Sequence, residues 1–131
     1  MESPAGLHHV AVRCADLGRC ETFYREVLGL EVLRRWPAEG GGDRSVWLKA
    51  GEGGAFVALE HADGDATRSA FDAAPAGWYV VALRIERSER RAWEQRLASH
   101  GVAVARKSPW SVFFQDPEGN RIALTHWPEE A

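Results

Sequence analysis

The segment VALEH at residues 57–61 returns near the end of the chain as IALTH at residues 122–126. A second pair of similar segments lies before these two, HVAVR at residues 9–13 and VVALR at residues 80–84. Two pairs of similar segments in the same order indicate that one supersecondary unit was duplicated, and the fold prediction rests on this duplication. Each half of the chain can therefore be compared with the other, position by position.

Both halves predict the same order of elements. Alternating apolar and polar residues predict a strand, and an Asp or Ser cap followed by an apolar stripe that ends at Gly predicts a helix. Turns rich in Gly, or built on Asp-Pro, separate the remaining strands. The first half is expected to hold strand 7–13, a helix from Asp16 to Gly29, and strands 31–36, 45–50 and 55–61; the second is expected to hold strand 78–85, a helix from Ser88 to Gly101, and strands 102–106, 110–115 and 121–125.

The predicted fold class is α+β, built from two tandem βαβββ modules at about residues 6–61 and 78–127. A linker at residues 62–77, rich in Ala, Asp and Gly, joins the modules. At 131 residues the chain is long enough to bury a core, and we expect a single domain of residues 1–131.

Composition excludes several classes of partner. The formal net charge is −3 and the basic residues are interleaved with Glu, so we expect neither nucleic acid nor an anionic membrane as a partner. No apolar run approaches the roughly 20 residues that span a bilayer, and the N-terminus lacks the pattern of a signal peptide. Only Cys14 and Cys20 are present, which fits a reducing compartment, and the predicted location is cytoplasmic.

Five short motifs carry a resemblance to a known family. They are LHHV at 7–10, DL at 16–17, FY at 23–24, VLGL at 27–30 and DPEGN at 116–120. With these motifs in this order, the chain resembles the vicinal oxygen chelate superfamily, also called the glyoxalase/bleomycin resistance/dioxygenase family. The resemblance implies that the curved mixed sheets of the two modules enclose a cavity, and it implies a homodimer.

Strand alternation indicates which side chains would line such a cavity. On each first strand one face is apolar, as packing under a helix requires, and the other mixes small and polar groups. If the family fold holds, the cavity is lined by His9, Ala11, Arg13, Phe56, Ala58, Glu60, Val80, Ala82, Arg84, Arg121, Ala123 and Thr125.

The resemblance also implies four metal-ligand positions, one on the first and one on the last strand of each module. In this chain they are His9, Ala58, Val80 and Ala123, and only the histidine can coordinate an ion. The standard tetrad is therefore predicted to be lost, and a divalent metal is possible but not favoured. The alternative is a relocated metal site, or a metal-free base pair, formed by His9 and Glu60.

The remaining polar and aromatic residues suggest a binding pocket for a small molecule. Arg13 and Arg84 occupy matching positions and could hold a carboxylate or phosphate between two guanidinium groups; Glu60 could instead pair with one of them. Trp47 and Trp78 could stack on a flat ligand. We predict a small-molecule-binding protein whose ligand is anionic or aromatic, contacted by His9, Arg13, Trp47, Glu60, Trp78, Arg84 and Thr125. The alternative is a metal-dependent lyase, isomerase or dioxygenase-type enzyme that uses His9 and Glu60.

Overall fold

The structure is a computed structural model of the chain, and it describes residues 2–66 and 70–129. Internal contacts divide the chain into two compact units, residues 1–65 and residues 66–131. Each unit holds one of the predicted modules, and each is described by itself. The later linker residues belong to the second unit.

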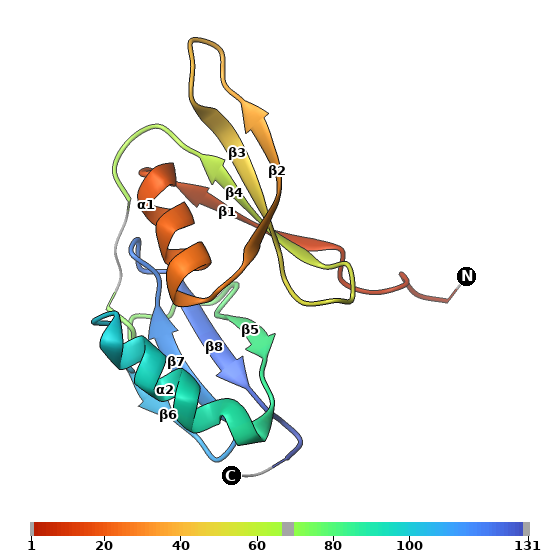
Figure 1. Cartoon of the computed structure of the whole chain (residues 1–131), viewed down its shortest axis with the longest axis vertical. Coiled ribbons are helices and arrows are strands. Elements are labelled where there is room, and N and C mark those ends of the chain that lie inside the picture. The colour runs from red at the N-terminus through yellow and green to blue at the C-terminus, as the bar shows by residue number, and fades with distance from the viewer. Residues whose placement is uncertain (1, 67–69, 130–131) are drawn as a thin grey trace. The chain divides into compact units, whose positions relative to one another are not determined.

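The first module is a four-stranded mixed sheet with one helical segment (Figure 1). The strand order is β1-β4-β3-β2, with β1 parallel to β4 and the other pairs antiparallel. The elements are β1 (His9–Cys14), α1 (Leu17–Thr22) continued by a π-helical turn (Phe23–Val27), β2 (Glu31–Pro37), β3 (Asp43–Lys49) and β4 (Phe56–His61).

Helix α1 covers one face of this sheet. It begins where the sequence predicts, because the Asp16 carboxylate accepts a hydrogen bond from the backbone N–H of Arg19 at 3.1 Å. The chain leaves the π-helical turn through Gly29, whose φ of 73° is the left-handed conformation that glycine adopts at little cost. The buried side chains beneath the helical segment are Leu17, Cys20, Phe23, Tyr24 and Val27 from the helix, and Val46, Leu48, Val57 and Leu59 from β3 and β4.

The second module repeats this topology, with strand order β5-β8-β7-β6 and β5 parallel to β8. The βαβββ order is thus confirmed in both halves. The elements are β5 (Val81–Arg84), a 3₁₀ turn (Arg87–Glu89), α2 (Arg90–Ser99), β6 (Arg106–Lys107), β7 (Ser111–Gln115) and β8 (Arg121–Thr125). Arg90 and Glu94 connect α2 to the sheet, through a hydrogen bond from Arg90 Nη2 to the Ser111 carbonyl at 3.4 Å and an ion pair between Glu94 and Lys107 at 2.6 Å.

Two strands of the second module are shorter than predicted. The strand expected at 78–85 is paired only over Val81–Arg84, opposite Ile122 to Thr125 of β8. The strand expected at 102–106 is instead Arg106–Lys107, since only these residues pair with β7. The predicted cap at Ser88 is also wrong. The helical segment begins after Glu86, whose backbone N–H donates to the Glu89 carboxylate at 3.3 Å, and Ser88 lies inside the first turn.

The predicted turn before the last strand is confirmed in detail. Asp116 Oδ1 accepts hydrogen bonds from the backbone N–H groups of Glu118 at 2.9 Å and Asn120 at 3.0 Å. Gly119 has a φ of 88°, which closes the turn. This turn fixes where β8 begins and therefore which residues face which side of the second sheet.

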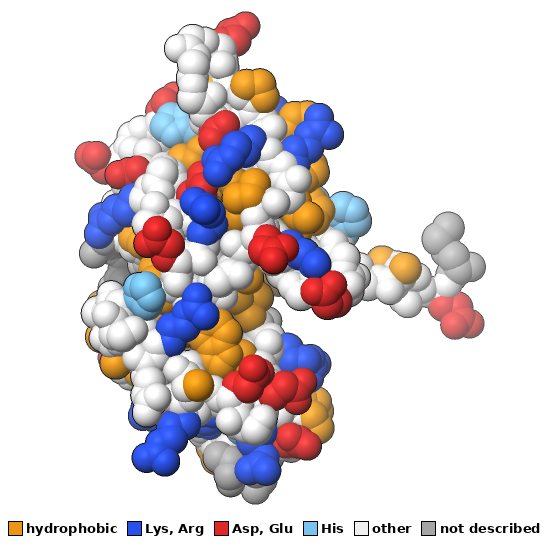
Figure 2. Space-filling view, in the orientation of Figure 1, with side chains coloured by type: hydrophobic (Ala, Val, Ile, Leu, Met, Phe, Trp, Pro, Cys, Tyr) orange, Lys and Arg blue, Asp and Glu red, His pale blue; other side chains and the backbone are white. Residues whose placement is uncertain are grey.

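The surface carries mixed charge. On the face that Figure 2 shows, basic and acidic side chains lie interspersed. Within residues 2–66 and 70–129, no helix has the length and apolar character needed to cross a membrane.

Candidate functional site

The face of the first sheet that α1 does not cover is called the helix-free face. The register of the strands arranges the side chains of this face in three rows that run across the strands. Paired residues of neighbouring strands point to the same side, so the pairing gives each row directly. The polar row is Arg13, Glu60, Ser45 and Trp36; the alanine row is Ala11, Ala58, Trp47 and Arg34; the histidine row is His9, Phe56, Lys49 and Glu31.

Aromatic rings stack along this face from one edge of the sheet to the other. The His9 ring lies 4.8 Å from the Phe56 ring and nearly parallel to it, at 8°. Phe56 stacks on Trp47 at 4.6 Å, and Trp47 contacts Trp36 at 5.2 Å. The Arg34 guanidinium lies 3.7 Å above the Trp36 ring. Trp47 is therefore on the helix-free face, as the strand alternation requires, and its neighbours hold its ring in place.

His9 and Glu60 are not brought together by this sheet. In the register of β1 and β4, His9 pairs with Phe56 and Arg13 pairs with Glu60, which is four residues further along β4. His9 and Glu60 therefore lie about 13 Å apart along the strands. The Nδ1 atom of His9 lies 2.9 Å from the Nδ1 atom of the exposed His8. In the described ranges, no three or more His, Cys, Asp or Glu residues are grouped so that they could share an ion.

The polar row contains two buried groups without hydrogen-bond partners in the described chain. Ser45 is only 2% exposed and its hydroxyl has no partner, and the indole N–H of the neighbouring Trp36 has none either. Glu60 is half-buried and Arg13 is exposed. Although these two residues are cross-strand partners, they form no ion pair in the part of the chain that the structure describes. The row therefore combines two buried donors that have no partner among the described residues with Arg13 and Glu60, which are more exposed.

The matching row of the second module is satisfied internally. Ser111 and Thr125 are the counterparts of Ser45 and Glu60 by register, and the Ser111 hydroxyl donates to Thr125 Oγ1 at 2.8 Å. Arg84, the counterpart of Arg13, donates from Nη1 to the Trp127 carbonyl at 3.5 Å. The predicted site residues Arg84 and Thr125 thus lie together on the helix-free face of the second sheet.

Part of that second face is covered by the chain itself. The Arg121 guanidinium donates three hydrogen bonds to backbone carbonyls, to Phe71 at 2.9 Å, Ala73 at 2.6 Å and Ala70 at 3.3 Å. The Phe71 ring contacts Phe113 at 6.3 Å, and Arg106 lies 4.4 Å above the Phe113 ring. Phe71 is absent from the predicted site residues, although it is a large apolar side chain in a stretch otherwise rich in Ala, Asp and Gly.

The predicted stacking residue Trp78 lies outside the strands. It precedes β5 and is fully exposed, at 104%. Its neighbour Tyr79 contacts the Phe71 ring at 6.3 Å. The second module therefore does not place Trp78 beside Arg84 and Thr125 on a common strand.

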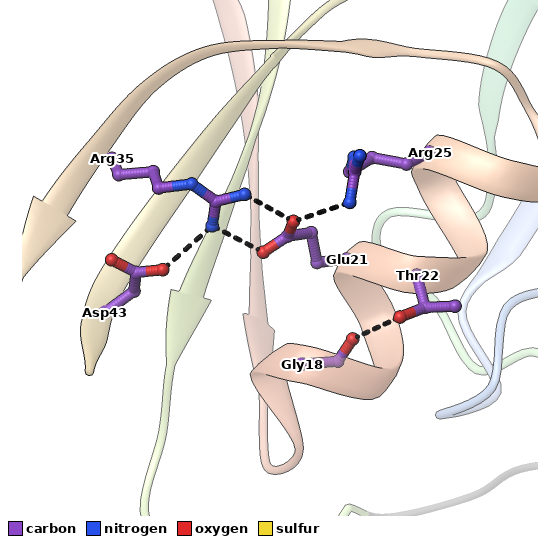
Figure 3. Close-up of polar contacts among 6 residues, drawn as sticks. All are labelled: Gly18, Glu21, Thr22, Arg25, Arg35 and Asp43. Atoms are coloured by element: carbon purple, nitrogen blue, oxygen red, sulfur yellow. Dashed lines mark hydrogen bonds and ion pairs between the residues drawn. The ribbon is translucent and has the colours of Figure 1, made fainter.

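The opposite face of the first module carries its strongest ion pairs (Figure 3). Arg35 donates to both carboxylate oxygens of Glu21 at 2.7 Å, and also to Asp43 at 2.9 Å. These hydrogen bonds lower the pKa of Glu21 and raise the pKa of Arg35. Because this cluster connects α1 to β2 and β3, it stabilises the module without taking part in the helix-free face.

The fold and the arrangement of its faces define a class. Two tandem βαβββ modules, each with a four-stranded mixed sheet, one helix-covered face and one helix-free face, are typical of the glyoxalase fold. The family model of the Glyoxalase/Bleomycin resistance protein/Dioxygenase superfamily matches residues 6–124, and the chain belongs to this superfamily.

Several known proteins are similar to the chain. A protein named glutathione transferase FosA, from Serratia marcescens, is 29% identical over 121 residues, which cover 90% of this chain and 78% of that protein. A glyoxalase/dioxygenase from Nostoc punctiforme has a TM-score of 0.80 at 21% identity, covering 95% of this chain and 92% of that one. A lactoylglutathione lyase from Agrobacterium tumefaciens has a TM-score of 0.72 at 23% identity, covering 98% of this chain and all of that one, at 100%.

The resemblance assigns four positions to metal ligands, and the side chains at these positions do not supply four donor atoms. His9 has a coordinating nitrogen, but its ring is stacked on Phe56. Ala58, Val80 and Ala123 have no donor atom. These four side chains therefore cannot surround an ion in the standard arrangement.

Proposed function

We propose that the protein binds a small anionic molecule with an aromatic part, on the helix-free faces of its modules and without the standard metal tetrad. The observation that supports this most strongly is the polar row of the first module, where Arg13 has no ion-pair partner among the described residues and the aromatic stack lies on the same face. A guanidinium without an ion-pair partner among the described residues, on the same sheet face as a stack of aromatic rings, suits a carboxylate or phosphonate carried by an aromatic ring.

Arg84 provides an equivalent candidate anion contact on the second module by itself. It occupies the position in the second module that Arg13 occupies in the first, and its guanidinium makes a long hydrogen bond to the Trp127 carbonyl at 3.5 Å. A bond of that length is weak, so the guanidinium can turn to a ligand at little cost.

The test is binding of benzoate and phenylphosphonate, measured by titration calorimetry. We expect the wild-type protein to bind at least one of them, and the variants Arg13→Gln and Arg84→Gln to bind it about tenfold more weakly, the loss of one charge-assisted contact. Arg91→Gln is the matched control, because Arg91 is exposed on α2 and belongs to neither row. If Arg13→Gln and Arg84→Gln both bind the probe with the affinity of the wild type, the proposed anion contacts are wrong.

A metal-dependent enzyme is the second candidate, because a relative at 29% identity is named a transferase. In that case His9 would contribute to the site without Glu60, which lies about 13 Å away along the strands, and the remaining ligands would come from substrate or water. Metal analysis of the purified protein separates the two candidates. A stoichiometric transition metal that is lost in His9→Ala would favour the enzyme; protein without stoichiometric metal that still binds an aromatic anion favours the binding protein.

The proposal includes a homodimer in the cytoplasm. Several large apolar side chains are exposed on the chain, including Trp78 at 104% and Leu7 at 73%, and a second copy could cover such groups. Sedimentation analysis is expected to give about twice the 14.5 kDa mass of one chain; a single-chain mass would contradict the dimer.

A further inference from the structure

We propose that the segment at residues 70–79 closes a site for an aromatic acid on the second module, with Phe71 in the place of the ligand's ring. The residues of the site are Arg106, Phe113 and Arg121. This inference rests on the proposed function, and it adds a second group of contacts and a segment that competes with the ligand for them. The site is closed in this structure and opens when the segment leaves.

The segment at residues 70–79 precedes β5 and contains a tight turn. The backbone N–H of Ala73 donates to the Ala70 carbonyl at 3.0 Å, and Phe71 is the second residue of this turn. Phe71 is half-buried, whereas residues 72–79 are exposed. The segment therefore turns one large side chain towards the module and keeps most of its length in water.

The Phe71 ring lies among groups that attract an aromatic ring. It meets the Phe113 ring edge to face, at 6.3 Å and 66°. The guanidinium groups of Arg106 and Arg121 lie 5.9 Å and 5.6 Å from its centre, and a cation at such a distance is attracted to the ring face. Two cations and an aromatic ring thus form a place for a ring on the helix-free face of the second module.

The turn also brings oxygen atoms to one of these cations. Arg121 Nε donates to the Phe71 carbonyl at 2.9 Å, and Nη2 donates to the carbonyls of Ala73 at 2.6 Å and Ala70 at 3.3 Å. Several oxygens on one guanidinium, next to an aromatic ring, are also what an aromatic carboxylate or phosphonate would present. The turn therefore resembles the proposed ligand in both of its parts.

A charged ligand would bind these cations more strongly than the turn does. The carbonyl oxygens of the turn are neutral, and among the described residues neither Arg121 nor Arg106 forms an ion pair. Hydrogen bonds between a guanidinium and an ionised acid are stronger than those to a neutral acceptor. An aromatic acid can therefore displace the turn from Arg121.

The first module shows why the ring over this face can leave. Phe56 and Trp47 occupy the positions that Arg121 and Phe113 occupy in the second module. In the first module the two rings stack on each other at 4.6 Å and belong to the sheet itself. In the second module Arg121 replaces one ring, and Phe71 supplies a ring from outside the sheet.

Opening of the segment would leave the second sheet intact. In the described part of this module, residues 70–79 pair with no strand. Segments with few buried contacts open at a small fraction of the cost of global unfolding. Because ligand and segment would exclude each other, each must weaken the binding of the other by the same factor.

The first experiment measures the affinity for phenylphosphonate by titration calorimetry. Phe71→Ala is expected to bind it about tenfold more tightly than the wild type, since closure lowers the apparent affinity by the fraction of open molecules. Phe71→Tyr keeps the ring and should bind like the wild type. The gain should disappear when Arg121→Gln is added to Phe71→Ala, and it should be smaller for methylphosphonate, which has no ring.

The second experiment uses the wild-type protein and chymotrypsin, which cleaves after aromatic residues. Saturating phenylphosphonate is expected to speed cleavage after Phe71 several-fold, as identified by mass spectrometry, because cleavage follows the population of the open segment. In Arg121→Gln the segment is already released, so cleavage should be fast with or without the probe. A probe that slows cleavage after Phe71 in the wild type, or leaves it unchanged, would overturn the inference.

The outcomes of the affinity measurements separate this inference from the proposed function. Equal affinity of the wild type and Phe71→Ala, an equal gain for methylphosphonate, or a gain that survives Arg121→Gln would each overturn the closed site and leave the proposed function in place. If only Phe71→Ala binds the probe, and does so through Arg121, the inference holds and the contacts of the proposed function are wrong. Binding of neither phenylphosphonate nor benzoate by either protein would overturn both proposals.

Discussion

At the scale of single residues, the Glu21 carboxylate pairs with two arginines of the first module. It receives two hydrogen bonds from Arg35 at 2.7 Å and one from Arg25 at 3.3 Å (Figure 3). Its side chain is only 13% exposed, so the charge is screened less than that of a surface pair. Arg35, which also binds Asp43, connects the helix to the β2–β3 hairpin through this carboxylate.

Glu21→Gln is expected to destabilise the protein by about 1 kcal/mol at neutral pH. The pKa of Glu21 is lowered from its ordinary value of 4.5, chiefly by the hydrogen bonds from Arg35. The pKa of this carboxylate is lower in the folded state than in the unfolded chain. Its full contribution to stability is therefore present at pH values above the pKa of the unfolded chain, and the contribution is lost as the pH falls through the pKa of the folded state. The stability difference between wild type and Glu21→Gln should therefore be constant above about pH 5.5 and shrink towards pH 3 in urea titrations.

Arg25→Gln is the control for this prediction. It removes a single, longer contact from an exposed side chain and leaves the Arg35 pair in place, so its effect should stay within about 0.5 kcal/mol. If the difference between wild type and Glu21→Gln grew as the pH fell, the assigned direction of the pKa shift would be wrong.

Residue types and spacing predict which side chains share a face, but they do not predict whether a polar group finds a partner. The alternation of β1 and β4 correctly places Arg13 and Glu60 together. Ser111 has a partner, whereas Ser45 has none among the described residues. This difference depends on whether the facing residue is Glu or Thr and on the rotamer that each adopts, which only the three-dimensional structure shows.

At the scale of the elements, the two helices begin in different ways although their sequences look alike. Asp16 accepts the N–H of Arg19 and caps α1, as its position predicts. Ser88 occupies the matching place in the second half but lies within a 3₁₀ turn that starts after Glu86. A Ser near a helix start is an ambiguous signal when Glu86 and Glu89 on either side can make the terminal hydrogen bond instead.

Asp16→Ala is therefore expected to cost about 1 kcal/mol of stability, the usual effect of losing an N-cap. Ser88→Ala should change the free energy of unfolding by less than about 0.5 kcal/mol, because no capping bond is lost. Chemical denaturation of the two variants checks this contrast. A larger loss in Ser88→Ala than in Asp16→Ala would contradict the observed helix starts.

The segment at residues 70–79 is held to the second module mainly by Arg121. Its guanidinium binds three carbonyls of the segment and lies 5.6 Å from the centre of the Phe71 ring. Composition predicts a linker here and gives no sign of this attachment, because the partners are backbone carbonyls, which every residue has.

Arg121→Gln is expected to release this segment, since a Gln cannot reach three carbonyls with a fixed fork of donors. Backbone amides in and near the segment should exchange with deuterium at least about tenfold faster, while those of the first module keep their rates. The control is Arg106→Gln, which also removes a guanidinium near the Phe71 ring, at 5.9 Å, but has no hydrogen bond to the segment among the described residues. Equal release in both variants would show that ring contacts, not the carbonyl bonds, hold the segment.

At the scale of the whole molecule, duplication explains why the fold was predictable and the site was not. Helix-facing positions must be apolar in both modules, so their pattern survives in both copies and predicts the topology. Positions on the helix-free faces are free of that requirement and have diverged, as Trp47 and Phe113 or Glu60 and Thr125 show. Their side chains therefore share no pattern from which a ligand could be derived, and only the register and the hydrogen bonds of each module show which of them meet.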